Sequence, residues 1–128
     1  MTKRIQLKVF AYPLFIVSLV AAGCSRSASG PPAALESAKV PATVNTAFSQ
    51  ASGQTKQIET SYVSAFQNQD PTAAFVELQK LRAQHDLNAQ QQSVVTRAWM
   101  TTMQQLQAAA QNGNQSAQAE LQQYISTR

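Results

Sequence analysis

The 128-residue sequence predicts an all-α protein, a small antiparallel bundle of about four helices on a flexible N-terminal tether. Beyond residue 41, apolar residues recur three and four positions apart, which is the period of an amphipathic helix. Alanine, glutamine and leucine, all good helix formers, dominate the same region, and no β-branched alternation indicates strands. The sequence therefore divides into a leader (1–23), a linker (24–41) and a helical-bundle domain (42–128).

The first expected helix covers residues 43–67, and Gly53 is a weak point inside it, costing up to about 1 kcal/mol relative to alanine. Its apolar stripe fits a bundle face and also a heptad seam. We expect it to pack within its own chain, as part of a monomeric domain; the alternative is a projecting helix that pairs with a partner or a second copy. The stripe is Val44, Phe48, Ala51, Thr55, Ile58, Tyr62 and Ala65, and its expected contacts are Phe75, Leu78, Trp99 and Leu106.

Asp70 and Pro71 mark the start of the second expected helix, because aspartate is a favoured N-cap and proline fits the first helical position. One face of this helix is apolar, and two ion pairs are expected on another face. The apolar residues are Ala74, Phe75, Leu78 and Leu81, and the pairs are Glu77 with Lys80 and Arg82 with Asp86.

Asn88 and Gln91 form a capping-box-like pattern that predicts the start of a third helix. Gly113 is expected to end it as a left-handed residue, and Asn114 or Ser116 to begin a short last helix. Aromatic side chains are expected to dominate the thin core of the bundle, and Trp99 to be buried between helices. The aromatic set is Phe48, Tyr62, Phe66, Phe75, Trp99 and Tyr124.

The first 23 residues have the three parts of a secretory signal: a basic start, an apolar run over residues 9–20, and small residues before Cys24. The apolar run is shorter than the roughly 20 residues that a membrane-spanning helix needs, and Pro13 interrupts it. A permanent transmembrane anchor is therefore not expected.

The run Val20-Ala21-Ala22-Gly23-Cys24 resembles the lipobox of bacterial lipoproteins. This resemblance implies cleavage between Gly23 and Cys24, a diacylglyceryl group on the cysteine thiol and acylation of the new amino group. Ser25, which is not aspartate, implies the outer membrane. The alternative is ordinary signal-peptidase cleavage after Ala22, since Ala21 stands where leucine is commonest in the class. That cleavage would leave a free thiol in an oxidising compartment.

The linker from Ser25 to Pro41 is rich in Ser, Ala, Gly and Pro, a composition typical of a tether that reaches roughly 55 Å when extended. Without the leader, seven basic residues stand against six acidic ones, a net charge of +1. Because phosphate binding needs several cations on one surface, nucleic acid is not an expected partner.

Residues that support catalysis are scarce in the sequence, so we expect no enzyme, no cofactor and no metal. His85, the one histidine, lies near Asp86 and is interpreted as a solvated or helix-terminal residue rather than a base or ligand. Haem, di-iron, hydrolase, phosphate-loop and calcium motifs are not found. Met100 and Met103 are interpreted as core filler rather than a groove lining.

Paired and tripled glutamines, such as residues 90–92, are the unusual surface feature; they suit a solvated helix face, with glycan binding as the alternative. Together these observations predict a non-enzymatic, lipid-anchored envelope protein that faces the periplasm. It is expected to contact the membrane through Cys24 and to act on an unidentified envelope protein in an accessory or structural role. The alternative is a small binding, inhibitory or immunity-type lipoprotein.

Overall fold

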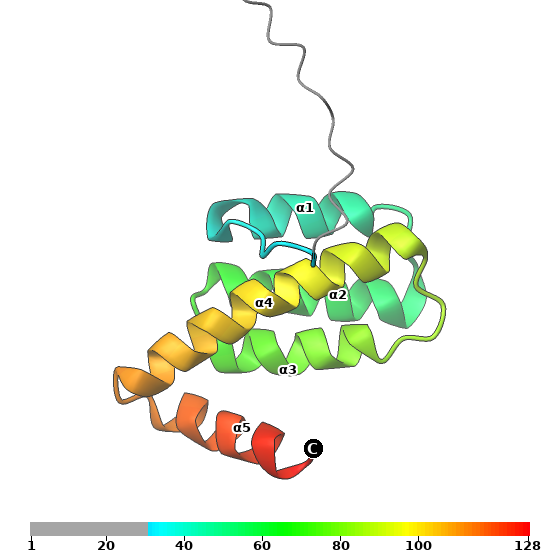
Figure 1. The fold of residues 1–128 in the computed structure, drawn as a ribbon. Coiled ribbons are helices and arrows are strands. Elements are labelled where there is room, and N and C mark those ends of the chain that lie inside the picture. The colour runs from blue at the N-terminus through cyan, green and yellow to red at the C-terminus, as the bar shows by residue number, and fades with distance from the viewer. Residues whose placement is uncertain (1–30) are drawn as a thin grey trace, which may run out of the picture.

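The computed structural model describes residues 31–128, which form a helical bundle and contain no strand (Figure 1). The all-α prediction is confirmed. The helix α2 packs on α3, α3 on α4, and α1 on both α2 and α4, while α5 turns back from the projecting end of α4 (Figure 1). The elements are a 3₁₀ turn, Ser37–Lys39, and the helices α1 Val40–Ala47, α2 Gly53–Gln67, α3 Pro71–Arg82, α4 Ala89–Gln111 and α5 Gln115–Ser126.

The folded domain begins before residue 42, so the expected linker boundary is wrong. Leu35 is only 7% exposed and belongs to the main apolar cluster. Its carbonyl accepts a hydrogen bond from the Thr101 hydroxyl at 2.5 Å, and Arg97 Nε donates to the carbonyl of Ala33 at 2.9 Å. Val40, also expected in the linker, is fully buried. The composition that suggested a tether thus includes a segment fixed along α4.

The first expected helix is divided in two, which corrects the prediction of one helix over residues 43–67. Helix α1 ends at Ala47, and α2 begins at Gly53, whose φ of +58° is in the left-handed region that favours glycine. Ser52 before it is extended, as an N-cap residue is. Since Phe48 at the break is fully buried, the bend lets both helices direct their apolar faces into one core.

Two of the expected helix starts carry the predicted side-chain caps. Asp70 Oδ1 accepts a hydrogen bond from the backbone N–H of Ala73 at 3.0 Å. At the start of α4, the amide of Gln91 donates to Asn88 Oδ1 at 2.9 Å, and Gln91 Oε1 accepts from the amide of Asn88 at 3.0 Å. The capping box is therefore confirmed, and one of the expected surface glutamines is a buried cap residue.

The turn between α4 and α5 also follows the prediction. Gly113 has a φ of +89°, which places it in the left-handed region after the last turn of α4. Asn114 then caps α5, because its Oδ1 accepts a hydrogen bond from the amide of Ala117 at 3.0 Å. A single glycine and a single asparagine thus reverse the chain and start α5.

Replacement of Asn88 by alanine is expected to lower the free energy of unfolding by about 1 kcal/mol, because it removes the side-chain half of the capping box. Urea denaturation of the chain without its leader measures this loss. Gln90→Ala, in the same first turn but exposed, is the matched control and is expected to change stability by less than about 0.5 kcal/mol. Equal effects of the two substitutions would contradict the capping role.

The core consists of two clusters, so the expected packing of the first helix is only partly confirmed. Leu78 lies with α1 and α2 in the larger cluster, and Trp99 packs against it. Phe75 and Leu106 instead join Ala117 of α5 in the second cluster. The expectation that Trp99 is buried is only partly confirmed, since it packs against both clusters but keeps part of its surface exposed. The other expected aromatic core residues are buried except Tyr124, which is half-buried like Trp99.

Candidate functional site

Residues expected to carry chemistry do not gather in one place. His85 and Asp86 are exposed in the turn between α3 and α4. Within residues 31–128, no three histidine, cysteine, aspartate or glutamate side chains are grouped closely enough to hold a metal ion. Gly23 and Cys24, the expected cleavage and lipidation residues, lie outside the described residues. In the described part of the chain, no helix is both long enough and apolar enough to span a membrane.

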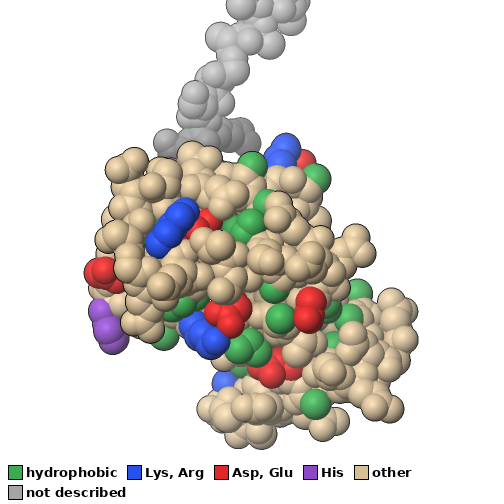
Figure 2. Space-filling model, turned by 180° about the vertical axis from the view of Figure 1, so that it is seen from behind, with side chains coloured by type: hydrophobic (Ala, Val, Ile, Leu, Met, Phe, Trp, Pro, Cys, Tyr) green, Lys and Arg blue, Asp and Glu red, His purple; other side chains and the backbone are tan. Residues whose placement is uncertain are grey.

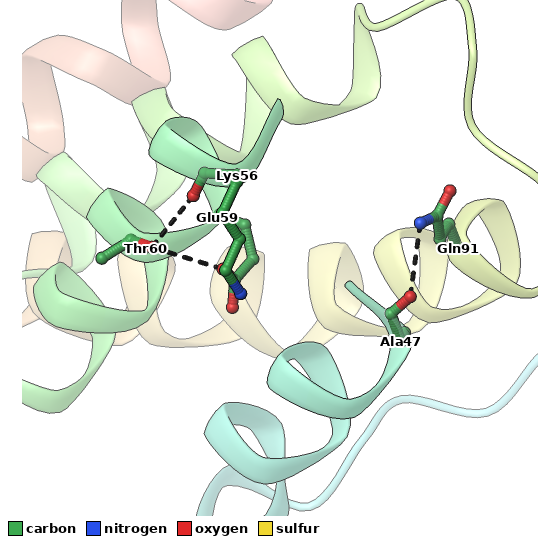
Figure 3. A network of polar contacts seen from close by, with 5 residues as sticks. All are labelled: Ala47, Lys56, Glu59, Thr60 and Gln91. Carbon is green, nitrogen blue, oxygen red and sulfur yellow. Dashed lines mark hydrogen bonds and ion pairs between the residues drawn. The ribbon is translucent and has the colours of Figure 1, made fainter. Parts of the chain in front are cut away.

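Among residues 31–128, Glu59 is the one carboxylate buried in the core, near the middle of α2 (Figure 3). Its side chain is 1% exposed, and Oε2 lies 2.7 Å from Nζ of Lys56, which is 41% exposed. The Thr60 hydroxyl donates to the Lys56 carbonyl at 2.9 Å and to Glu59 Oε2 at 3.4 Å. Glu59 Oε1 has no hydrogen-bond partner among the described residues. Because the Glu59 carboxylate is closed off from solvent, it cannot act as an accessible acid or base. Its ion pair with Lys56 has a structural role.

A second polar contact joins the end of α1 to α4. Gln91 Nε2 donates to the carbonyl of Ala47 at 3.3 Å (Figure 3). A hollow of about 270 Å³ lies beside this contact, between the α1–α2 and α3–α4 connections, and Ser52, Asp86 and Asn88 are among its lining residues. Its lining is mostly polar, and the N-terminal ends of α2 and α4 beside it would favour a bound anion. The negative charge of Asp86 in the same lining opposes such binding.

Tyr62 and Thr102 form a buried polar pair between α2 and α4. Their hydroxyl oxygens are 2.9 Å apart, and both side chains are fully buried. Burial raises the pKa of Tyr62 to about 12, although the hydrogen bond with Thr102 acts in the opposite direction. The phenol is consequently held neutral in the folded protein up to high pH.

Alkaline pH is expected to weaken the fold through Tyr62. Because its pKa is raised from 10.0 to about 12 on folding, the folded state holds the proton more tightly, and this stabilisation is complete below pH 10. It is lost as the pH rises through 12, by about 2 to 3 kcal/mol in all. Urea denaturation of wild type and Tyr62→Phe between pH 8 and 12 measures it: the wild type should lose that much more stability. Parallel pH profiles for the two chains would contradict the assignment.

Three aromatic rings meet where α3, α4 and α5 converge. The Phe75 ring lies 4.6 Å from that of Trp99 and 5.4 Å, edge to face, from that of Tyr124. The Trp99 and Tyr124 rings are 5.6 Å apart. Phe75 is fully buried beneath, so the half-buried Trp99 and Tyr124 form the outer part of this cluster.

Two arginines and one isoleucine complete this surface. The Arg82 guanidinium lies 4.3 Å from the centre of the Trp99 ring, instead of in the expected pair with Asp86. Arg128 lies 4.7 Å from the Tyr124 ring and donates a hydrogen bond to its hydroxyl. Ile125, beside Tyr124 in the sequence, is 70% exposed and is the only large hydrophobic side chain so exposed among residues 31–128. We call Arg82, Trp99, Tyr124, Ile125 and Arg128 the Arg–aromatic patch.

Charge elsewhere on the surface is sparse. Most of the face in Figure 2 consists of backbone and of side chains that are neither charged nor hydrophobic, and the charged groups are scattered. Each lysine of residues 31–128 pairs with a carboxylate: Lys39 with Glu36, Lys56 with Glu59, and Lys80 with Glu77 as predicted, each at 2.7 Å. Met103 packs against the second cluster, as expected of core filler.

Sequence reasoning missed the Arg–aromatic patch because its members come from three helices, and no local spacing brings them together. The one available signal was the presence of two large apolar residues, Tyr124 and Ile125, at consecutive positions of the last helix, because consecutive positions point in different directions. Comparison of the chain with protein-family models, curated proteins and solved structures gives no match.

Proposed function

We propose that this chain is a lipid-anchored, non-enzymatic protein of the bacterial cell envelope that acts through protein contacts. The lipobox-like run that ends at Cys24 carries the proposal. It assigns Gly23–Cys24 as the cleavage point, the Cys24 thiol as the acylated group and, through Ser25, the periplasmic face of the outer membrane as the location. The helical bundle is then the part that contacts an envelope protein, in an accessory or structural role.

The position of Leu35 supports a short connection between the lipid and the domain. Eleven residues lead from Cys24 to Leu35, and at about 3.3 to 3.6 Å per residue they span at most roughly 40 Å. Leu35 is held against α4 near Thr101, whereas α5 lies at the opposite side of the bundle (Figure 1). An anchored domain with this connection stays within roughly 40 Å of the membrane surface.

The Arg–aromatic patch supports action through protein contacts. Tryptophan, tyrosine and arginine are the residues that most often dominate binding energy at protein interfaces. Here they contact one another, and the exposed Ile125 follows Tyr124 on the same helix. The same observation favours the second candidate, a small inhibitory or immunity-type lipoprotein that covers a site on another protein.

Chemical crosslinking in intact cells tests the proposal, with the exposed amines of Lys39 and Lys80 as reactive groups. The expected result is a small set of envelope proteins joined to the wild-type chain and identified by mass spectrometry. The control is an unrelated lipoprotein made at the same level. If the chain joins no protein more often than this control does, the proposed contact function is wrong.

A further inference from the structure

We infer that the Arg–aromatic patch is the docking site for a protein segment that presents a carboxylate beside an apolar side chain. This inference rests on the proposed function, because it names the surface and the partner chemistry through which the domain would act. Three features of the patch carry it: two guanidinium groups without a carboxylate, an ordered aromatic base and an exposed isoleucine.

The guanidinium groups are oriented but not neutralised. Arg82 lies with its charge over the Trp99 ring and forms neither an ion pair nor a side-chain hydrogen bond with residues 31–128. A guanidinium held over a ring keeps the N–H donors at its edge free, in a geometry that matches a carboxylate. Arg128 uses one donor on the Tyr124 hydroxyl and has others left. All three lysines in the same range are paired with carboxylates, and Arg97, which is not, donates to the Ala33 carbonyl at the start of the described chain. Arg82 and Arg128 are therefore the cations without a carboxylate that lie against the aromatic rings.

The apolar part of the patch calls for an apolar group on the partner. Ile125 is 70% exposed, and removing such an apolar side chain from water on binding favours association. It adjoins Tyr124 in the sequence, which itself contacts both Trp99 and Arg128. One segment with an aliphatic residue next to an aspartate or glutamate would satisfy both halves of the patch.

A second copy of the domain is a poorer occupant than a different protein, because its own carboxylates are already engaged. Glu36 and Glu77 pair with lysines, and Glu59 is buried. Asp70 caps α3, and Glu120 accepts a hydrogen bond from Gln79 at 3.2 Å. Within residues 31–128 this leaves Asp86, which is exposed but has no large exposed hydrophobic neighbour. A segment of another protein fits better.

Site-specific photocrosslinking with the full-length chain in intact cells tests the inference. p-Benzoylphenylalanine replaces Ile125 in one chain and Gln123 in another; Gln123 is exposed on the same helix but lies about 200° around it. Each labelled chain is also made with Arg82→Gln, or with Lys80→Gln as the matched control, since Lys80 is on the same helix and already paired. Circular dichroism of the variants verifies that they fold.

The expected result is a protein adduct at position 125, formed on a segment that has aspartate or glutamate within four residues of an apolar residue. Arg82→Gln should lower its yield at least about fivefold and Lys80→Gln should not, because Arg82 has unused N–H donors whereas Lys80 is already paired with Glu77. Changing the partner's carboxylate to lysine, with Arg82→Glu in this chain, should restore it.

Several results would overturn the inference: adducts at 125 that join two copies or lipid, a segment without a carboxylate, equal losses with Arg82→Gln and Lys80→Gln, or no rescue by the charge exchange. Protein adducts at 123 and none at 125 would also refute it, while leaving the proposed function intact. The absence of protein adducts at both positions, together with no partner in the chemical crosslinking, would refute both.

Discussion

Replacement of Phe75 by alanine is expected to lower the free energy of unfolding by about 3 to 5 kcal/mol, the largest loss we predict for a single side chain. The Phe75 ring is fully buried, and it contacts Trp99 of α4 and Tyr124 of α5. Its removal leaves a cavity at the junction of three helices and takes away the base of the Arg–aromatic patch. In a domain of this size, such a loss is a large fraction of the total stability.

Urea denaturation of the chain without its leader, followed by circular dichroism, measures the effect. Ile125→Ala is the control, because this side chain is 70% exposed and its loss should change stability by less than about 0.5 kcal/mol. The fluorescence of Trp99, the only tryptophan, reports separately on the second cluster. A loss below about 1 kcal/mol for Phe75→Ala would mean that α5 does not depend on this packing.

Replacement of Cys24 by serine is expected to abolish acylation and to remove the mature, membrane-bound form of the protein. A hydroxyl does not replace the thiol that the lipobox resemblance assigns as the modified group. Buried acyl chains contribute about 0.8 kcal/mol per CH₂, so three chains anchor a protein almost permanently and their loss is an all-or-none change. The variant should be found as an unprocessed precursor or as a soluble chain.

Fractionation after labelling with an alkyne fatty acid measures this change. Ser27→Ala, three residues beyond the cysteine, is the control and should retain both the label and the membrane fraction. A Cys24→Ser chain that still incorporates label, or that fractionates as a processed membrane protein, would contradict the assignment of Cys24.

The helix ends that the sequence predicts well are those determined by a few neighbouring residues. Asp70, Asn88 and Asn114 cap their helices through side-chain bonds to amides three positions ahead, and Gly113 reverses the chain with a positive φ. Each of these contacts is local, so the residue types alone are enough to indicate them.

The features that the sequence does not predict depend on tertiary contacts. A glycine at position 53 is compatible both with one weakened helix and with two separate helices. The burial of Phe48 between α1 and α2 favours two helices. Leu35 lies in a segment with the composition of a linker, but hydrogen bonds with Thr101 and Arg97 of α4 and a place in the core fix it. Arg82 lies over the Trp99 ring of α4 and not beside Asp86, its expected partner.

In the candidate functional surface, too, the residue types are evident from the sequence but their arrangement depends on tertiary contacts. The sequence indicates Trp99 and Tyr124 as apolar members of two helices, and it gives no reason to place either at the surface. Both are partly exposed at the junction where α5 packs on α3 and α4. Such an arrangement depends on the angle between α4 and α5, which no local pattern encodes.

The intact mass of the mature protein, extracted from membranes in detergent, tests the lipid-anchored account most directly. The account predicts a chain that begins at Cys24 and carries the added mass of a diacylglyceryl group and one amide-linked acyl chain. Digestion should place all of that mass on the peptide that starts with Cys24. A chain that begins at Cys24 without lipid, or at Gly23 after ordinary cleavage, would contradict it.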